Sequence, residues 1–483
     1  MKRLFLLISV LTISSCSTQN SRDSVPSNYS SSSLSVESSA DDGFIDFAWE
    51  FEEYDIRSSQ TKPMNEYTEE DWNEHYKRYY GVIKDNNFVY YRRYAESNEY
   101  SILRCVSNDK DVTIPDTYRG QLVTGVALGA FCQCMNMETL RIGKNLRSLE
   151  TSSFENCLSL KNVVIDPENE NIVFQNNAIY LLQQGKQYLN YVLPIVEGDF
   201  AVSDDVYYIG SSAFNDAQEI SAITLGAHFH EFTTYFPNCL SVLSNLQEIR
   251  VSDLNSSYSD IDGVLVNKEK DTLVKCPSGK NGEYVLPNGI QSIGPYAFNQ
   301  CYQLEKITIN GDVSFSPSQI ANNNSVIEFE LVNHPNYVSL NGNIYSKDLK
   351  TLYAVAPGKK EVLIENTVET ISESAVTADL SFITIPDSVK TICSRAINSP
   401  NLKTVVLGSG VLTIEDYAFG YDYHQISINQ LFYKGSVESL KNVQKTLKNI
   451  VLARAQRYYY SESKPGSFEN HYWHYVNDLP VVW

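Results

Sequence analysis

The residues of this chain best suited to chemistry are its nine cysteines. A thiolate can act as a nucleophile or bind a metal, and two thiols can form a disulfide. Four of the cysteines follow a phenylalanine by three residues, namely Cys134, Cys157, Cys239 and Cys301. Recurrence at one position of a repeat indicates one packing role, and a free cysteine packs as a small hydrophobic residue. We therefore expect buried thiols at these positions, while disulfide pairing cannot be read from spacing.

Histidines give a weaker signal. His228 and His230 are separated by one residue. No clear carboxylate or cysteine partner accompanies them, so an exposed loop is expected there. His471 and His474 stand among aromatic residues, which favours packing near the C-terminus. The chain contains no nucleophile elbow, phosphate-binding loop or HExxH zinc motif. We expect a binding protein without catalytic residues, metal or cofactor.

A short apolar frame, L-x-x-I-x-I, recurs along the chain and must position everything else. Its last two apolar positions alternate with one other residue, which predicts a strand with one buried face. Successive copies at Met137 and Leu160 are 23 residues apart, and those at Leu380 and Leu402 are 22 apart. The frame begins at Met137, Leu160, Ile220, Leu246, Leu304, Val326, Leu380, Leu402 and, more weakly, Ile428.

Two further elements repeat between these strands. Segments such as Ser292–Cys301 predict a short extended piece, a turn and one helical turn that buries Phe and Cys. Asp262-Gly263 and Asn341-Gly342, each between apolar runs, predict β-hairpin turns. With a similar segment at 171–194, they form three hairpin inserts that end in prolines about 80 residues apart.

The string Ile385-Pro386-Asp387-Ser388-Val389-Lys390-Thr391-Ile392, with the frames over residues 112–433, resembles the BspA-like bacterial leucine-rich repeats. The resemblance implies an α/β repeat solenoid: coils with a parallel strand face, short helical turns and interspersed β-hairpins, capped at both ends. It also implies a surface protein linked to adhesion to host proteins or other cells.

The N-terminus has the layout of a secretion signal. Lys2 and Arg3 precede the mostly apolar run 4–13, and Ile13-Ser14-Ser15-Cys16 resembles the bacterial lipobox, which implies that Cys16 is lipidated. We therefore expect a signal peptide at 1–15, a Ser-rich tether at 16–42 and an N-terminal cap at 43–111. A solenoid with three hairpin inserts should follow at 112–435, and a C-terminal helix and aromatic cap at 436–483.

The net charge of −20 makes a nucleic-acid partner or a polybasic contact with a membrane surface unfavourable. The only expected membrane contact is the N-terminal lipid, which places the chain on the extracellular face of a bacterial membrane. Extracellular or host proteins are the expected partners; glycans, which tyrosines can stack against, and a purely structural role are the alternatives.

Outward residues of the aligned strands are the expected binding surface. Inward positions must all satisfy the same packing, whereas outward positions differ from coil to coil and are free to specify a partner. We expect ten of these outward residues to form one continuous surface: Arg141, Asn162, Glu248, Arg250, Lys306, Thr308, Glu328, Glu330, Phe382 and Thr384.

Overall fold

The computed structural model describes residues 80–92, 94, 97–232, 238–321, 325–420, 428–446, 448–466 and 471–483. The chain divides into units 1–38 and 39–483, and every described residue belongs to the second. The expected signal peptide, Cys16, the tether and residues 43–79 of the expected cap lie outside the described residues. Among the helices that are described, none is long and apolar enough to cross a membrane.

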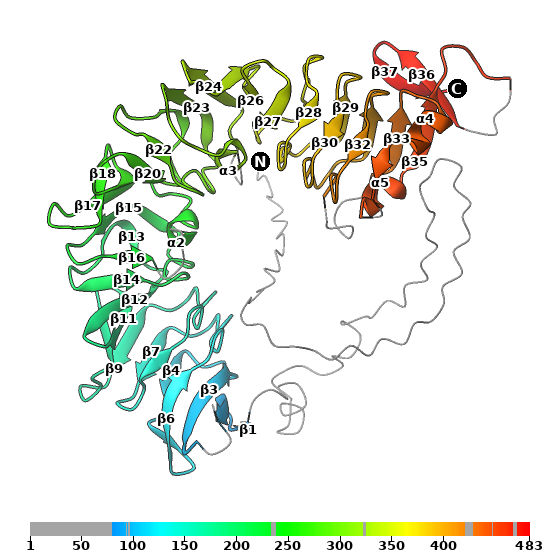
Figure 1. The fold of residues 1–483 in the computed structure, drawn as a ribbon. Coiled ribbons are helices and arrows are strands. Elements are labelled where there is room, and N and C mark those ends of the chain that lie inside the picture. The colour runs from blue at the N-terminus through cyan, green and yellow to red at the C-terminus, as the bar shows by residue number, and fades with distance from the viewer. Residues whose placement is uncertain are drawn as a thin grey trace, which may run out of the picture. The chain divides into compact units, whose positions relative to one another are not determined.

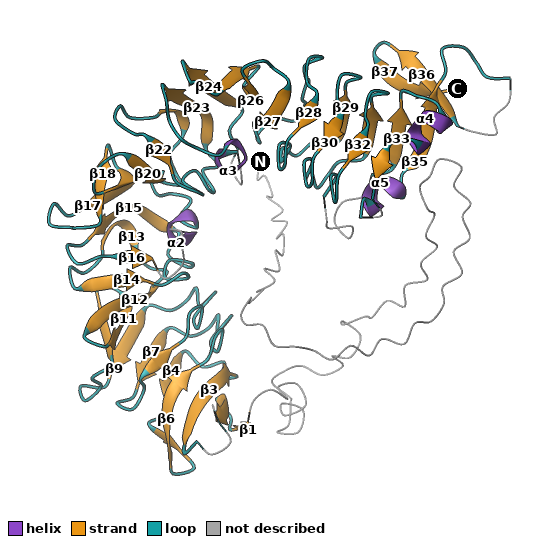
Figure 2. Ribbon diagram, viewed as in Figure 1, coloured by secondary structure: helices purple, strands orange, loops and turns teal. Residues whose placement is uncertain are grey.

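The L-x-x-I-x-I frames form the parallel strands that we call the front strands. Their alternation is as expected: Leu140 and Ile142 are buried, whereas Arg141 between them is exposed. In the described part of the chain they form four sheets (Figures 1 and 2). The front strands are β4 (Asp111–Ile114), β7 (Thr139–Ile142) and β9 (Asn162–Ile165); β13 (Glu197–Ala201), β15 (Glu219–Leu225) and β17 (Glu248–Val251); β21 (Gly282–Val285), β23 (Leu304–Asn310) and β24 (Glu328–Val332); and β29 (Phe382–Ile385), β31 (Thr404–Leu407), β33 (Gln430–Tyr433) and β35 (Gln456–Tyr460).

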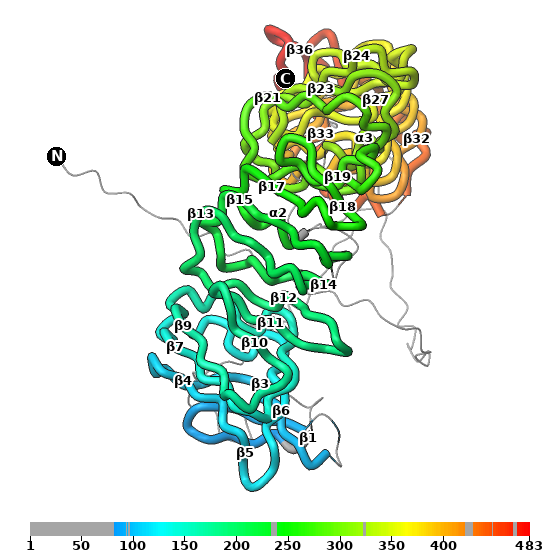
Figure 3. The backbone as a smooth tube through the Cα atoms, turned by 90° about the vertical axis from the view of Figure 1, so that its left-hand side faces the viewer, coloured from blue at the N-terminus to red at the C-terminus, as the bar shows by residue number. Residues whose placement is uncertain are grey.

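Short extended pieces between the front strands form a second parallel row, the back strands. Buried side chains from both rows share the hydrophobic core, so each coil stacks on the next (Figure 3). The back strands are β3 (Glu99–Cys105), β6 (Gln121–Val126) and β8 (Ser148–Leu149); β12 (Lys186–Val192), β14 (Val206–Ile209) and β16 (Glu231–Phe232); β20 (Thr272–Lys275) and β22 (Ser292–Ile293); and β27 (Thr351–Ala354), β28 (Thr370–Ile371), β30 (Thr391–Ile392), β32 (Thr413–Ile414) and β34 (Gln444–Lys445), with β5 (Thr117–Tyr118) paired to β6.

Each hairpin insert is the start of an antiparallel meander whose third strand opens a back sheet. The meanders add β10 (Ile172–Gln175) and β11 (Ala178–Gln183) before β12, β18 (Tyr258–Ile261) and β19 (Val264–Asn267) before β20, and β25 (Tyr337–Leu340) and β26 (Asn343–Ser346) before β27. The predicted N-terminal cap contains a fourth such meander, made of β1 (Tyr80–Lys84), β2 (Phe88–Arg92) and β3. All four have a register shift at the same place, between the second and third residues of the middle strand. The described part of the cap therefore begins the same higher-order repeat.

Helix is scarcer than predicted. The segments expected to form helical turns are instead chains of tight turns, because residues such as Tyr296 and Gln300 have positive φ and interrupt a right-handed helix. Likewise, the helix expected across 437–455 is interrupted by β34. The described helices are α2 (Asn238–Ser241), α3 (Pro317–Ile320), α4 (Val437–Lys441) and α5 (Ile450–Ala453).

The front strands do not form the continuous surface that was expected, because two hairpin turns end the central sheets. The backbone N–H of Ile249, on β17, donates to the carbonyl of Gly263 at 2.9 Å, and that of Phe329, on β24, donates to Gly342 at 3.0 Å. Both glycines have positive φ, and a Cβ on Gly263 would lie only 2.6 Å from Cγ of Glu248. Each turn thus occupies the edge of the last front strand, and the front row resumes after the meander.

One polar side chain before each insert holds the chain at this transition; Asn255 and His334 are buried, and Asn169 is half-buried. Asn169 and Asn255 each donate through the amide to two carbonyls and accept two backbone N–H groups. His334 occupies the corresponding place: its Nε2 lies 2.9 Å from the carbonyl of Val313, and its Nδ1 accepts from the N–H groups of residues 336 and 337. These bonds require the neutral imidazole with the proton on Nε2.

Candidate functional site

The outward residues of the front strands, here called the front face, differ sharply between the four sheets. On the sheet β13-β15-β17, Arg250 lies between two carboxylates. Its guanidinium is 2.9 Å from Asp199 on β13 and 2.5 Å from Glu248 on its own strand. Hydrogen bonding to Arg250 lowers the pKa of the Glu248 carboxyl. The group is a fixed, half-exposed cluster with two acids and one base.

The next sheet, β21-β23-β24, carries the same arrangement. The ammonium of Lys306 on β23 lies 3.1 Å from Glu328 and 2.9 Å from Glu330, both on β24. Thr308 donates to Glu330 at 3.1 Å and is almost fully buried by these neighbours. Hydrogen bonds from Lys306 and Thr308 lower the pKa of Glu330. Again two acids share one base on an open strand surface.

On the first sheet, β4-β7-β9, basic groups outnumber acids. Arg141 forms an ion pair with Asp111 at 3.2 Å. Glu138, just before β7, forms ion pairs with both Lys110 and Lys161. Asn162 on β9 is exposed, as predicted from the frame. This part of the front face therefore differs in charge from the two central sheets.

The last front sheet is different in kind, because its face is apolar and covered. Val406 and Phe432 point outward from β31 and β33, yet both are buried in a cluster with Trp473. Phe382 packs against the same cluster, and Thr384 beside it is half-buried. The alternation of the frame makes Val406 an outward residue, yet it is 0% exposed. A covering element that sequence reasoning did not place accounts for the difference.

That cover is the C-terminal hairpin of β36 (Tyr472–Val476) and β37 (Leu479–Val482). β36 continues the front sheet beside β35, and the indole of Trp473 reaches back across β35. Its Nε1 donates to the carbonyl of Tyr433 on β33 at 3.0 Å, and its ring meets that of Phe432 edge-on at 5.5 Å. The predicted aromatic cap thus closes the front face as well as the end of the stack. The many tyrosines and tryptophans within 458–483 indicated a C-terminal cap, but they did not indicate which face it would cover.

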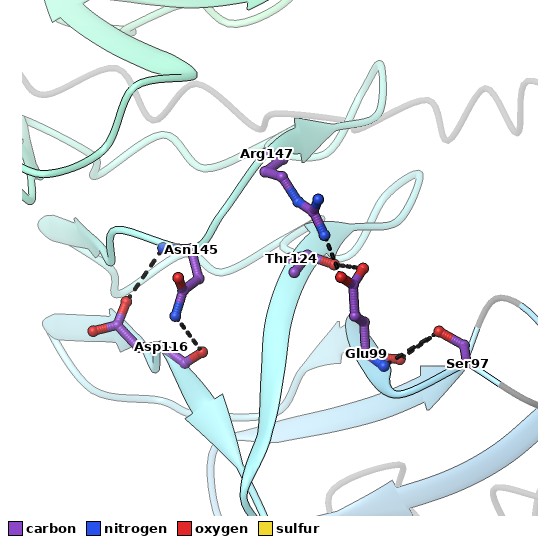
Figure 4. A network of polar contacts seen from close by, with 6 residues as sticks. All are labelled: Ser97, Glu99, Asp116, Thr124, Asn145 and Arg147. Atoms are coloured by element: carbon purple, nitrogen blue, oxygen red, sulfur yellow. Dashed lines mark hydrogen bonds and ion pairs between the residues drawn. The ribbon is translucent and has the colours of Figure 1, made fainter.

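A polar network ties the first back sheet together (Figure 4). Glu99 on β3 forms an ion pair with Arg147, which precedes β8, and accepts from Thr124 on β6 at 3.1 Å. Beside it, Asn145 donates through its side chain to the carbonyl of Asp116 at 3.2 Å. Because these polar groups satisfy one another, the network joins neighbouring coils and offers no group for a ligand.

The eight cysteines that the structure describes are free thiols. Cys157, Cys239 and Cys301 are buried, as expected, whereas Cys134 is half-buried. Burial raises the pKa of Cys239 to about 12, so its thiol stays protonated. Within the described residues, no group of three or more His, Cys, Asp or Glu is placed to hold a metal ion. His228 and His230 are both exposed, in the loop position that their sequence suggested.

Solved structures with a similar chain course come from bacterial leucine-rich-repeat proteins. A leucine-rich cell surface protein from Faecalibacterium prausnitzii is 17% identical, with a TM-score of 0.33, and the match covers 75% of this chain and 97% of that one. A leucine-rich-repeat protein from Eubacterium ventriosum is 15% identical, with a TM-score of 0.39 and coverage of 83% and 99%. The pneumococcal vaccine antigen PcpA is 18% identical, with a TM-score of 0.35 and coverage of 79% and 94%.

Sequence relationships are more decisive. No curated protein matches the chain. A family model does match: the BspA type leucine-rich repeat region, in six copies, over residues 99–182, 198–262, 278–354 and 350–462. These segments make up more than half of the chain and contain nearly all residues of the front strands. The chain therefore belongs to the BspA-type leucine-rich repeat family.

Proposed function

We propose that this protein is displayed outside the cell and binds an extracellular protein through the front face of its two central sheets. Family membership supports the surface location, and the lipobox-like Ser14-Ser15-Cys16 supports a lipid anchor. Binding rather than catalysis is the proposed activity, since the front face offers charged side chains but no nucleophile paired with a base.

One observation carries the proposal: the outward charges of the central sheets are held in place before any partner arrives. Arg250 is fixed by Asp199 and Glu248, and Lys306 is fixed by Glu328 and Glu330. Oriented charges lose little freedom on binding and favour a complementary surface over others. Because acids outnumber bases in both clusters, the favoured partner presents basic side chains.

A capture experiment tests this proposal. The full chain, immobilised, is exposed to a panel of extracellular host proteins, in parallel with the variant Glu248→Lys/Glu328→Lys/Glu330→Lys. The variant breaks the ion pairs, reverses the charge of both central clusters and should lose the specific capture. The matched control Glu269→Lys/Glu373→Lys/Glu415→Lys changes the net charge equally, at exposed glutamates beside the back strands, and should retain it. Equal capture by all three proteins, or none by the unaltered chain, would refute the proposal.

A further inference from the structure

A pocket beside the meander β10-β11-β12 has features that the front face lacks. It measures about 520 Å³, within the range of small-ligand sites, and lies where β11, β12 and β14 run side by side. Leu182, Gly185, Lys186 and Gln187 line it from the meander, and Asp205, Tyr207 and His228 line it from the next two coils.

The pocket forms where this meander extends beyond the length of the two later inserts. β11 and β12 have six and seven residues, whereas β19, β20, β26 and β27 have four each. The extra pairs, Leu182 with Gln187 and Gln183 with Lys186, extend β11 and β12 beyond the ends of the equivalent strands and close with a two-residue turn. Gly185 in that turn has a φ of +75°, and open space surrounds it. The extension thus places four lining residues where the two later inserts have only a loop.

Inside the pocket, Gln187 is unsatisfied. Its side chain is only 8% exposed, and its Oε1 has no hydrogen-bond partner among the described residues. An unpaired buried amide oxygen is destabilising and is rare in folded proteins. Because Gln187 lines the pocket, a turn of its side chain would bring this solvent-inaccessible oxygen to a ligand that donates a hydrogen bond.

The other polar groups define what else the ligand must offer. The ammonium of Lys186 lies 3.6 Å from the centre of the Tyr207 ring, and no ion pair joins Lys186 or Asp205 to another described residue. The pocket therefore presents one cation, one carboxylate and one amide oxygen, with no net charge among its Lys and Asp side chains. A ligand that satisfies this set must carry several groups that both donate and accept hydrogen bonds. Hydroxyl groups do both.

Aromatic rings continue outward from the pocket. A register shift between β12 and β14 leaves both Tyr207 and Tyr208 half-exposed in succession. Tyr207 stacks on His230 at 4.9 Å, and Tyr208 stacks on Tyr188 at 4.8 Å. Because Lys186 and His230 already lie against the Tyr207 ring, a sugar would pack with its C–H groups against the exposed edges of Tyr207 and Tyr208, while polar groups bind its hydroxyls.

We propose that this pocket is a second binding site, independent of the front face, which takes a neutral sugar unit of a glycan. A hydroxyl of the sugar donates to Gln187, others bridge Asp205 and Lys186, and the tyrosines form the wall along which further units extend. A neutral ligand is favoured because the pocket side chains balance in charge and the whole chain carries −20.

Saturation-transfer NMR with the full chain and glucose, galactose, mannose and N-acetylglucosamine tests the site, followed by a glycan array with neutral and sialylated arms. At least one neutral sugar should bind, and binding should weaken at least tenfold in both Gln187→Leu and Asp205→Asn. The leucine removes an unsatisfied polar atom at similar volume, so Gln187→Leu should melt at the same or a higher temperature than the unaltered chain, which separates lost binding from lost folding.

Gln183→Leu, an exposed residue of the same extension that does not line the pocket, is the control and should bind normally. The triple lysine variant of the front face should also bind the sugar normally, so failure of the protein-binding proposal would leave this one standing. Absence of binding by every sugar, preference for the sialylated arm, or undiminished binding by Gln187→Leu would overturn the inference.

Discussion

The central front sheets and the C-terminal front sheet follow the same frame but have opposite surfaces. On β17, β23 and β24 the outward positions are charged, half-exposed and joined in ion pairs across neighbouring residues. On β31 and β33 the same positions carry Val406 and Phe432, and the hairpin β36–β37 covers them. The frame therefore determines which way a residue points, whereas the outward residue types determine whether that surface is free for a partner.

The interior should be equally intolerant in both regions, and the largest effect is expected there. Ile307 on β23 is fully buried between coils, so Ile307→Asp would place an unpaired charge in the core. Urea unfolding should show a loss of more than about 4 kcal/mol or failure to fold. Unchanged unfolding would mean that the inward register assigned to the central sheet is wrong.

The cover of the C-terminal face should be the next most sensitive point. Trp473 is fully buried against Phe432 and donates to a backbone carbonyl, so Trp473→Ala should cost about 3–5 kcal/mol. It should also expose Val406 and increase the binding of an apolar dye. Leu479→Ala, on the same hairpin but 60% exposed, is the control and should change neither measurement. Equal effects of the two substitutions would argue against a specific cover by Trp473.

The boundary between the two regions depends on His334. Replacing it by Leu leaves two part-buried backbone N–H groups and one carbonyl without their partner, and this should cost about 1–3 kcal/mol. His334→Asn should cost much less, because Asn169 and Asn255 make the corresponding bonds in the other coils. Thermal unfolding of both variants decides the matter; similar losses would indicate that the ring is needed for packing alone.

The smallest effect is expected at the ion pairs of the central face. Because hydrogen bonding lowers the pKa of Glu330, its stabilising contribution is complete above the ordinary value of about 4.3 and is lost as the pH falls through the lowered value. An NMR titration should give a midpoint below about 4.3, and Lys306→Ala should return it toward that value. An identical midpoint in the variant would show that Lys306 does not hold Glu330. No melting change outside error is expected, since these groups are solvent-exposed.

Much of the fold could be predicted from the sequence because it depends on local spacing. The inward residues Leu304 and Ile307, the parallel strands and the Asn-Gly and Asp-Gly turns all follow from alternation and turn chemistry. The expected helical turns are tight turns instead, and this could not be predicted, because tyrosine and glutamine do not indicate the positive φ found at Tyr296 and Gln300.

The site was less predictable, because it depends on contacts between distant segments. That Trp473 covers Phe432, or that the turn at Gly263 ends the sheet at Ile249, follows from how coils stack rather than from any single frame. Arg250 and Lys306 were predicted as outward residues, but their fixed arrangement with acids of neighbouring strands became visible only in the structure. No sequence motif marks the pocket at Gln187, because it depends on the length of the strands β11 and β12.

The most direct test of the account is hydrogen exchange of the full chain with and without the protein that it captures. The two regions should respond differently: amides of β17, β23 and β24 should become protected in the complex, while those of β31, β33 and β36 should not change. Protection confined to the C-terminal hairpin, or no protection on the central strands, would contradict the claim that the open charged face is the binding surface.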